Sequence, residues 1–393
     1  MSLNVAAVQA ALRDEGLDGW LLYDFKGINP IAARVSGLAG RGVMATRRWY
    51  YLVPAEGAPR KLVHAIERHN LDYLPGDTTV YAGRQALEDG LSKLLAGTRR
   101  LALEYSPECA IPYLSRVDAG TLDLLRRLGA EPVSSGDLVQ RFEAVWSDEA
   151  LATHRAASER LYRVKDRAFE FVRTALAAGR AVNELDVQRV MVEAFTAEGL
   201  VSDSAPVVAA QENAGNPHYL PTEAHHRHIA PNEVLLLDLW GKLETPGAVF
   251  ADISWIGFTG SQVPGHVEKA WRAVSAARDA AAAFVLDGIR QRRDVRGWQV
   301  DRAARTVLIE AGYEGQILHR TGHSLGEEVH GNGVHMDDYE THDDRRLIPG
   351  TGFTIEPGLY FDTFGLRTEI NMTVGAAEAQ ITGPVQQDIV RLA

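Results

Sequence analysis

Cysteine is nearly absent from this 393-residue sequence, which contains only Cys109. One thiol excludes a disulfide framework and a thiolate zinc cage. Long apolar runs are also missing, because no stretch approaches the roughly 18 residues of a membrane-spanning helix. The first twenty residues lack both a basic start and a continuous apolar core, so we do not expect a signal peptide. We therefore expect no membrane partner.

Basic residues are too few for a nucleic-acid-binding protein. The chain has 41 lysines and arginines against 52 aspartates and glutamates, and its net charge is -11. Such a charge argues against a nucleic-acid partner. With 46% hydrophobic and 24% charged residues, the composition is that of a soluble globular chain. The length exceeds one ordinary domain, so we expect a cytoplasmic enzyme with two domains.

Residues 1–146 are predicted to form an α/β domain. Strand-like runs at 19–23, 48–53 and 101–105 alternate with helical spacing at 86–95 and 114–128. The domain boundary is placed before a long helical stretch at 148–180, where Ser147 can cap the helix. Residues 147–393 form the second predicted domain.

The second domain shows the same order of elements twice. In each half, two helices precede two strands, which indicates two related halves packed face to face. The predicted helices are 148–180, 183–198, 266–291 and 296–312, and the predicted strands are 233–242, 248–258, 352–361 and 366–374.

Four acids occupy these apolar, strand-like runs. Asp238 and Asp252 are symmetric about residue 245, while Glu356 and Glu369 are symmetric about a two-residue loop at 362–363. If these registers hold to within a residue or two, each pair faces across a hairpin at about 5 Å. Like charges at that distance require a proton or a bridging cation.

His323, in the segment Thr-Gly-His-Ser-Leu-Gly, can add an imidazole to these acids. Four carboxylates and one imidazole suit two divalent ions about 3.5–4 Å apart, an arrangement that activates water for hydrolysis. A structural role in turns or at the surface remains the alternative for each acid taken alone.

The set Asp, Asp, His, Glu, Glu in chain order resembles the M24 metallopeptidases, and most closely the branch of prolidase and aminopeptidase P. The segments that carry the resemblance are NPHYLP, LLLDLWG, ADISW, TGHSLGEEVH, TIEPGLYF and GLRTEI, between about 215 and 370. The resemblance implies an α+β chain with a pita-bread catalytic domain and a smaller creatinase-like α/β N-terminal domain. It also implies a homodimer.

The resemblance also assigns roles to individual residues. Asp238 would bind one metal, His323 and Glu356 the other, and Asp252 and Glu369 both. The two divalent ions would be manganese, or else cobalt or zinc. The catalytic set would be His218, His330, Glu356 and Arg367. The segment 331–346 is longer and more charged than is usual in the family, which leaves His335 as an alternative to His330.

The expected function is hydrolysis of Xaa-Pro bonds, with a dipeptidase (prolidase) favoured over an aminopeptidase P that acts on longer proline-containing peptides. A dipeptidase needs a partner for the substrate carboxylate, and Arg47, Arg48 and Arg320 are the candidates. Two other classes remain open. One is a metal-independent, creatinase-like hydrolase; the other is a serine hydrolase in which Ser324 lies in a Gly-x-Ser-x-Gly motif.

Overall fold

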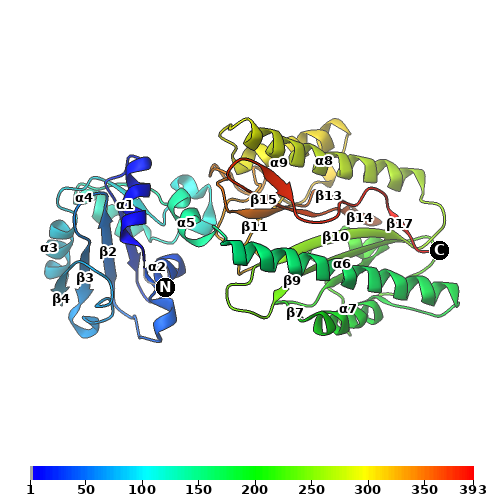
Figure 1. Cartoon of the computed structure of the whole chain (residues 1–393), viewed down its shortest axis with the longest axis horizontal. Helices are drawn as coiled ribbons and strands as arrows, with labels where there is room; N and C mark the ends of the chain where they lie inside the picture. Colours follow the sequence, from blue (N-terminus) through cyan, green and yellow to red (C-terminus); the bar gives the residue numbers. More distant parts are fainter. Residues whose placement is uncertain (1–2) are drawn as a thin grey trace. The chain divides into compact units, whose positions relative to one another are not determined.

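The computed structural model describes residues 3–393, which form two compact units divided between Glu143 and Ala144 (Figure 1). The division lies close to the boundary expected after residue 146. Each unit has its own hydrophobic cores. Within the described residues, every helix is too short or too polar to span a membrane.

The first unit contains one six-stranded sheet in the order β4-β3-β2-β1-β5-β6. β2 runs antiparallel to both of its neighbours, and the other adjacent pairs are parallel. The strands are β1 (Gly19–Asp24), β2 (Trp49–Pro54), β3 (Arg60–His64), β4 (Asp77–Tyr81), β5 (Arg100–Leu103) and β6 (Glu131–Ser134).

Helices cover both faces of this sheet, because successive residues of a strand point to opposite faces. Trp20 and Leu22 of β1 join one apolar cluster, with residues of α1, α2 and α5, and Leu21 and Tyr23 join the other, with residues of α3 and α4. The helices are α1 (Val5–Asp14), α2 (Pro30–Ser36), α3 (Arg84–Leu94), α4 (Ala119–Arg127) and α5 (Gly136–Glu143).

The helix predicted at 114–128 begins later than expected. A short 3-10 turn at Pro112–Leu114 precedes it, and the Asp118 side chain accepts a hydrogen bond from Thr121 N at 2.9 Å. Asp118 is therefore the N-cap of α4, and the residues before Asp118 are not part of this α-helix.

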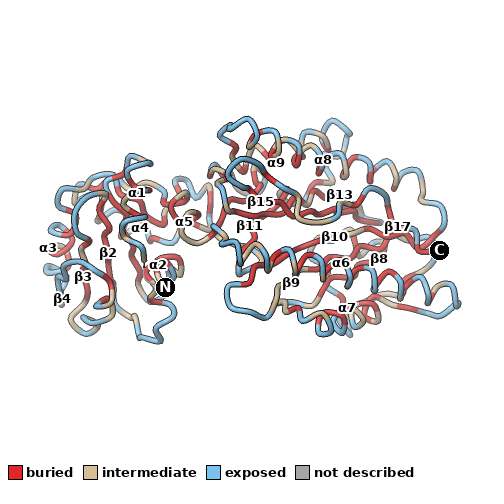
Figure 2. Tube along the Cα trace, in the orientation of Figure 1, coloured by how far each residue is buried: buried red, intermediate tan, exposed pale blue. Residues whose placement is uncertain are grey.

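In the second unit, two pairs of helices flank the strands (Figure 1). The pair α6 and α7 shares one apolar cluster with β8, β9 and β10, and the pair α8 and α9 shares another with β12–β15. Figure 2 shows that the strands between the two pairs are almost entirely buried. The helices are α6 (Asp148–Ala177), α7 (Glu184–Glu198), α8 (Gly265–Arg290) and α9 (Gly297–Glu310), and Ser147 caps α6 as predicted.

The strands of this unit form two main sheets and a short hairpin. One sheet has the order β17-β10-β9-β7, with β8 also paired to β9, the other has the order β11-β12-β15-β16, and β13 pairs with β14. The strands are β7 (Leu200–Val201), β8 (Val207–Ala210), β9 (Val234–Leu243), β10 (Ala251–Phe258), β11 (Ser324–Leu325), β12 (Gly352–Ile355), β13 (Gly358–Phe361), β14 (Phe364–Arg367), β15 (Ile370–Val374), β16 (Ala379–Ile381) and β17 (Val390–Arg391).

The register between β9 and β10 differs from the predicted one. Asp252 lies opposite Trp240, and Asp238 lies opposite Ser254, so the two acids are not directly paired. The ladder is displaced by two residues from the predicted pairing. β9 continues to Leu243, so the hairpin is centred on residue 246 and not on residue 245. An even displacement preserves the face to which a side chain points. Both aspartates therefore remain on one face of the hairpin.

Each strand predicted around Glu356 and Glu369 is interrupted. The ladder of β12 with β15 ends at Ile355 opposite Ile370, and the ladder of β13 with β14 starts at Gly358 opposite Arg367. Both ladders keep the register that was predicted, so the two glutamates fall opposite each other in the gap. Pro357 has no N–H group to donate, which accounts for the break in pairing at this point.

Candidate metal centre

Three ligating side chains meet in the second unit. They are Asp252 of β10, His323 just before β11, and Glu369 between β14 and β15, and one ligand atom of each lies within 4.8 Å of the other two. All three residues are buried. On one side of the His323 ring, Nδ1 lies 3.1 Å from Ser324 O. On the other side, Nε2 lies 3.5 Å from Asp252 Oδ2. Nδ1 therefore carries the proton, and Nε2 is left to face the carboxylates.

Glu356 and Asp238 complete this cluster. Glu356 Oε1 lies 3.4 Å from Nε2 of His323. Asp238 joins through Ser254, whose Oγ lies 2.9 Å from Asp238 Oδ1 and 2.9 Å from Glu369 Oε2. The structure thus brings together the five side chains to which the sequence pointed.

Burial and crowding of negative charge perturb these acids strongly. Burial, and then repulsion from the neighbouring acids, raises the pKa of Asp252 and of Glu369 well above the ordinary values. Burial also raises the pKa of Asp238. For Glu356, burial raises the pKa, but electrostatic interactions with His323, His319 and nearby arginines outweigh it, and the pKa is lowered. Burial lowers the pKa of His323 and favours the neutral ring that binds metals.

Two buried oxygen atoms of the cluster, Asp252 Oδ1 and Glu369 Oε1, lack any hydrogen-bond partner among the described residues. Leaving a buried carboxylate oxygen unpaired is costly. A divalent cation would satisfy both oxygens and relieve the repulsion that raises the two pKa values. The residues therefore fit a metal of the kind that prefers oxygen and imidazole ligands.

Arg367 lies inside the cluster and not at its margin. Its Nη2 donates to Asp238 Oδ2, its Nε donates to Ser254 Oγ at 2.9 Å, and its Nη1 donates to Tyr360 OH at 3.2 Å. Despite burial, the charge of Asp238 holds the pKa of Arg367 well above its ordinary value. The guanidinium thus compensates part of the negative charge and fixes the position of Asp238.

The predicted catalytic histidines occupy different surroundings. The ring of His330 packs edge-on against that of His323, with 4.3 Å between the ring centroids. Desolvation and the charge of His323 lower the pKa of His330 to about 4, although part of its ring is exposed to solvent. His335 is buried, and its Nδ1 accepts a hydrogen bond from Ser324 N at 3.1 Å. It therefore supports the backbone next to His323, and His330 is the histidine whose ring contacts the cluster.

His218 is exposed on a loop, and within the described chain its ring makes no hydrogen bond, ion pair or ring contact. The loop follows a 3-10 turn at Gln211–Gly215, which packs closely on the hairpin of β13 and β14. A side chain added at Gly365 would lie 1.8 Å from Ala214 O, so only glycine allows this approach. The structure thus places the turn before His218 on the hairpin, and no contact joins the described ring of His218 to the acids.

Several residues of the site were missed by the sequence analysis. Ser254 and Asn371 are buried in β10 and β15 and contact the acids or their backbone. His319 Nε2 lies 2.7 Å from Tyr360 OH, which connects this histidine to Arg367. Strand periodicity places Ser254 on the same face as Asp252, and this was the one available signal.

The unusual segment 331–346 is ordered by buried aspartates. Asp337 accepts hydrogen bonds from the backbone of the next turn, at residues 339–341, and Asp343 forms an ion pair with Arg345. Arg320 Nη1 lies 3.9 Å from Asp337 Oδ2, so the segment also positions this arginine.

Ser324 does not have the geometry of a serine nucleophile. It lies in the short strand β11, with no helix directly after it, and its buried Oγ accepts a hydrogen bond from Gly333 N at 3.0 Å. A nucleophile elbow requires an exposed serine in a tight strand-to-helix turn. The Gly-x-Ser-x-Gly match is therefore a coincidence of the glycine-rich loop.

The buried cluster of acids and imidazole can hold a metal ion. The family model for metallopeptidase family M24 matches residues 152–376, more than half of the chain. The chain belongs to this family. The α+β class expected from the sequence is confirmed, with the pita-bread fold and the smaller creatinase-like N-terminal domain.

Two relatives of the chain are described as dipeptidases. A protein of Mycobacterium tuberculosis described as "Probable dipeptidase PepE" is 30% identical over 249 residues, which are 63% of this chain and 60% of that protein. An "Xaa-Pro dipeptidase" of Lactobacillus helveticus is 28% identical over 202 residues, 51% of this chain and 49% of that protein. These alignments span less than two thirds of either relative.

The crystal structure of dipeptidase PepE from Mycobacterium ulcerans resembles the whole chain. Its TM-score is 0.67 at 23% sequence identity, and the match covers 99% of this chain and 96% of that one. At this identity the likeness establishes the shared fold.

Proposed function

We propose that the protein is a dinuclear metallopeptidase that hydrolyses Xaa-Pro bonds, with dipeptides as its preferred substrates. The observation that carries this proposal is the pair of unpartnered oxygens on Asp252 and Glu369, beside Nε2 of His323. Asp252 and Glu369 are proposed as ligands shared by both ions, Asp238 as a ligand of one, and His323 and Glu356 as ligands of the other. Manganese, cobalt and zinc all suit such ligands.

When bound, the two ions would supply Lewis acidity toward the substrate carbonyl and lower the pKa of a water molecule. Glu356 is proposed to accept a proton from this water and to deliver it to the leaving nitrogen. Its lowered pKa keeps Glu356 ionised, which is the form that can accept a proton. Its position is fixed by Thr354 Oγ1, which donates to Glu356 Oε1 at 3.2 Å.

His330 is proposed to stabilise the tetrahedral intermediate, because its ring lies against that of the ligand His323. Arg367 is a positioning residue for Asp238, which it holds together with Ser254. The catalytic role of His218 rests on the family resemblance and stays a prediction, as do the homodimer and the cytoplasmic location.

A preference for dipeptides requires a partner for the carboxylate of proline, and Arg320 is the candidate in the catalytic unit. Arg320 lies three residues before the proposed ligand His323, and its charge acts on the pKa values of Glu356, His323 and His330. The two relatives are described as a dipeptidase and an Xaa-Pro dipeptidase, which agrees with this choice. Proline itself forms a tertiary amide without N–H, so a pocket can select it by shape.

The proposal is tested by the metal content of the purified protein, measured together with its activity. We expect two divalent ions per chain and hydrolysis of Xaa-Pro dipeptides that stops with a chelator and returns with manganese. Activity that survives complete removal of metal would support a metal-independent hydrolase instead. Faster hydrolysis of longer Xaa-Pro peptides would make the protein an aminopeptidase P.

A further inference from the structure

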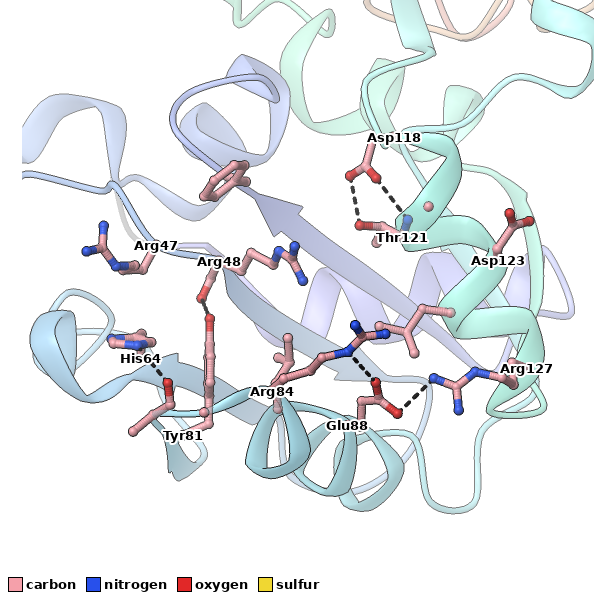
Figure 3. Close-up of a pocket in the computed structure, with 16 residues that line it drawn as sticks. Arg47, Arg48, His64, Tyr81, Arg84, Glu88, Asp118, Thr121, Asp123 and Arg127 are labelled. Atoms are coloured by element: carbon pink, nitrogen blue, oxygen red, sulfur yellow. Dashed lines mark hydrogen bonds and ion pairs between the residues drawn. The ribbon is translucent and has the colours of Figure 1, made fainter.

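A pocket of about 700 Å³ lies in the first unit, at the ends of its sheet strands (Figure 3). Phe25 directly follows β1, while His64 and Tyr81 are the last residues of β3 and β4. These three strands run in the same direction, so the pocket lies at their carboxyl ends. Open α/β sheets bind their ligands in crevices at this edge.

The start of α3 forms one wall of the pocket. Ala82, Gly83 and Arg84 line it, and Gly83 occupies the N-cap position without a capping side chain. The first turn of α3 contains no acidic residue. The N–H groups at a helix start carry partial positive charge and bind anions when no side chain caps them.

Arg48 adds a full positive charge to the same pocket. Its side chain extends toward the centre of the pocket in Figure 3, and its guanidinium carbon lies 5.7 Å from the centre of the Phe25 ring. Within the described chain this guanidinium forms neither a hydrogen bond nor an ion pair. The side chain of Arg47, its neighbour, donates to Thr46 Oγ1 at 3.0 Å, and the backbone N of Arg47 donates to Glu67 Oε2 at 3.0 Å.

Three acids line the pocket, and each has a partner within the unit; that of Asp123 is Arg126, at 3.7 Å. Glu88 is shared by Arg84, at 3.2 Å, and by Arg127, at 2.8 Å, so this trio keeps one positive charge. Asp118 caps α4 and also accepts a hydrogen bond from Tyr23 OH at 2.9 Å. Four arginines and three acids line the pocket, so its lining carries a surplus of one positive charge.

Apolar side chains complete the lining. Phe25, Tyr81, Leu87 and Leu124 contribute to it, and the volume is in the range of ordinary small-molecule sites. His64 is not a donor to a ligand, because its Nδ1 accepts from Ile66 N and its Nε2 is 3.2 Å from Ala82 O.

We propose that this pocket is a second binding site of the protein. Its ligand is a small organic anion in which a carboxylate or phosphate is attached to an apolar or aromatic group. The anionic group would bind between the Arg48 guanidinium and the uncapped start of α3, and the apolar group would contact Phe25 and Tyr81. The site belongs to the first unit alone and takes no residue from the metal centre.

The test is isothermal titration of the full-length, metal-loaded protein with four probes. Phenylacetate and phenyl phosphate combine charge and ring, inorganic phosphate supplies charge alone, and benzyl alcohol supplies the ring alone. We expect at least one of the first two to bind more tightly than both partial probes. Which of the two binds better identifies the carboxylate or the phosphate as the preferred group.

Substitutions then locate the binding. Arg48→Gln should raise the Kd of the better probe at least about tenfold, since a hydrogen bond to a charged group contributes more than one decade of affinity. Arg84→Gln should also raise the Kd, because it removes a positive charge from the start of α3. Arg99→Gln is the matched control, because Arg99 is exposed and directly precedes β5, at the opposite end of the strands. An unchanged Kd in both pocket variants, or no binding of either combined probe at millimolar concentration, would overturn the proposal.

Discussion

The side chain of Asn371, in one sheet of the second unit, forms two hydrogen bonds with the backbone of Asp252, in the other sheet. Asp252 N donates to Asn371 Oδ1 at 3.0 Å, and Asn371 Nδ2 donates back to Asp252 O. One carboxamide thus replaces a ladder between β10 and β15 at the point where the acids converge. The position of a proposed ligand in one half of the unit is therefore fixed by a side chain from the other half.

Replacing this carboxamide should affect both stability and metal binding. In Asn371→Ala, the buried N–H and C=O of Asp252 lose their partners, and we expect a loss of about 2–4 kcal/mol in the free energy of unfolding. Metal affinity should fall by about ten- to hundredfold, as is typical when residues that support ligands are removed. Urea unfolding and metal titration measure the two effects. Gln380→Ala, in the neighbouring strand β16, is the control, and equal behaviour of the two variants would contradict this role.

The acids themselves should show opposite effects with and without metal. Asp252→Asn or Glu369→Gln removes a repelling buried charge, so the metal-free variant should unfold at a higher temperature than the metal-free wild type. The same change should abolish stabilisation by metal and lower activity more than about a hundredfold, since even residues that only support the ligands contribute that much.

Thermal unfolding in chelator and in manganese separates these two effects. Glu223→Gln is the matched control, because Glu223 is an exposed acid that pairs with Arg189. Full activity of either ligand variant would reject the two-metal assignment, and equal melting temperatures of the metal-free proteins would show that the repulsion is negligible.

The sequence predicted those features of the site that depend on neighbouring residues, and it did not predict contacts between residues far apart in the chain. Apolar flanks identified the four acids, and the register around Glu356 and Glu369 was correct because a two-residue loop fixes it. The register of Asp238 and Asp252 is displaced by two residues, at the edge of the predicted range, because a longer loop leaves it less constrained. Contacts between the two sheets, such as that of Asn371, join residues 119 positions apart, and no local pattern encodes them.

A buried histidine outside the metal centre should control the acid stability of the protein. His154 of α6 is held between Phe250 O and Thr382 Oγ1, each at 2.7 Å, and burial lowers its pKa from 6.5 to about 4. Between these two values the unfolded chain binds a proton that the folded chain excludes. Stability is therefore complete above pH 6.5 and is lost toward pH 4, at about 1.4 kcal/mol per pH unit for this group.

Chemical unfolding of the metal-free protein at several pH values tests this contribution. The variant His154→Gln should be less stable at neutral pH but should lose less stability on acidification. His226→Gln, a change at an exposed histidine, should keep the slope of the wild type. An unchanged slope in His154→Gln would assign the acid sensitivity to other groups.

Substrate length provides the sharpest test of the role of Arg320. If this arginine binds the proline carboxylate, Arg320→Ala should raise the KM for an Xaa-Pro dipeptide by about ten- to hundredfold, because a charge-assisted pair of about 1.5–3 kcal/mol is lost. The kcat should change less, since the bond is made equally in the ground state and in the transition state. A tripeptide Xaa-Pro-Xaa carries its carboxylate one residue further on, so its slower hydrolysis should be nearly unaffected.

Arg302→Ala is the control, because Arg302 also pairs with an acid of the segment 331–346 but is more exposed than Arg320. Equal losses with dipeptide and tripeptide would show that Arg320 supports the fold of this segment and does not select the length of the substrate.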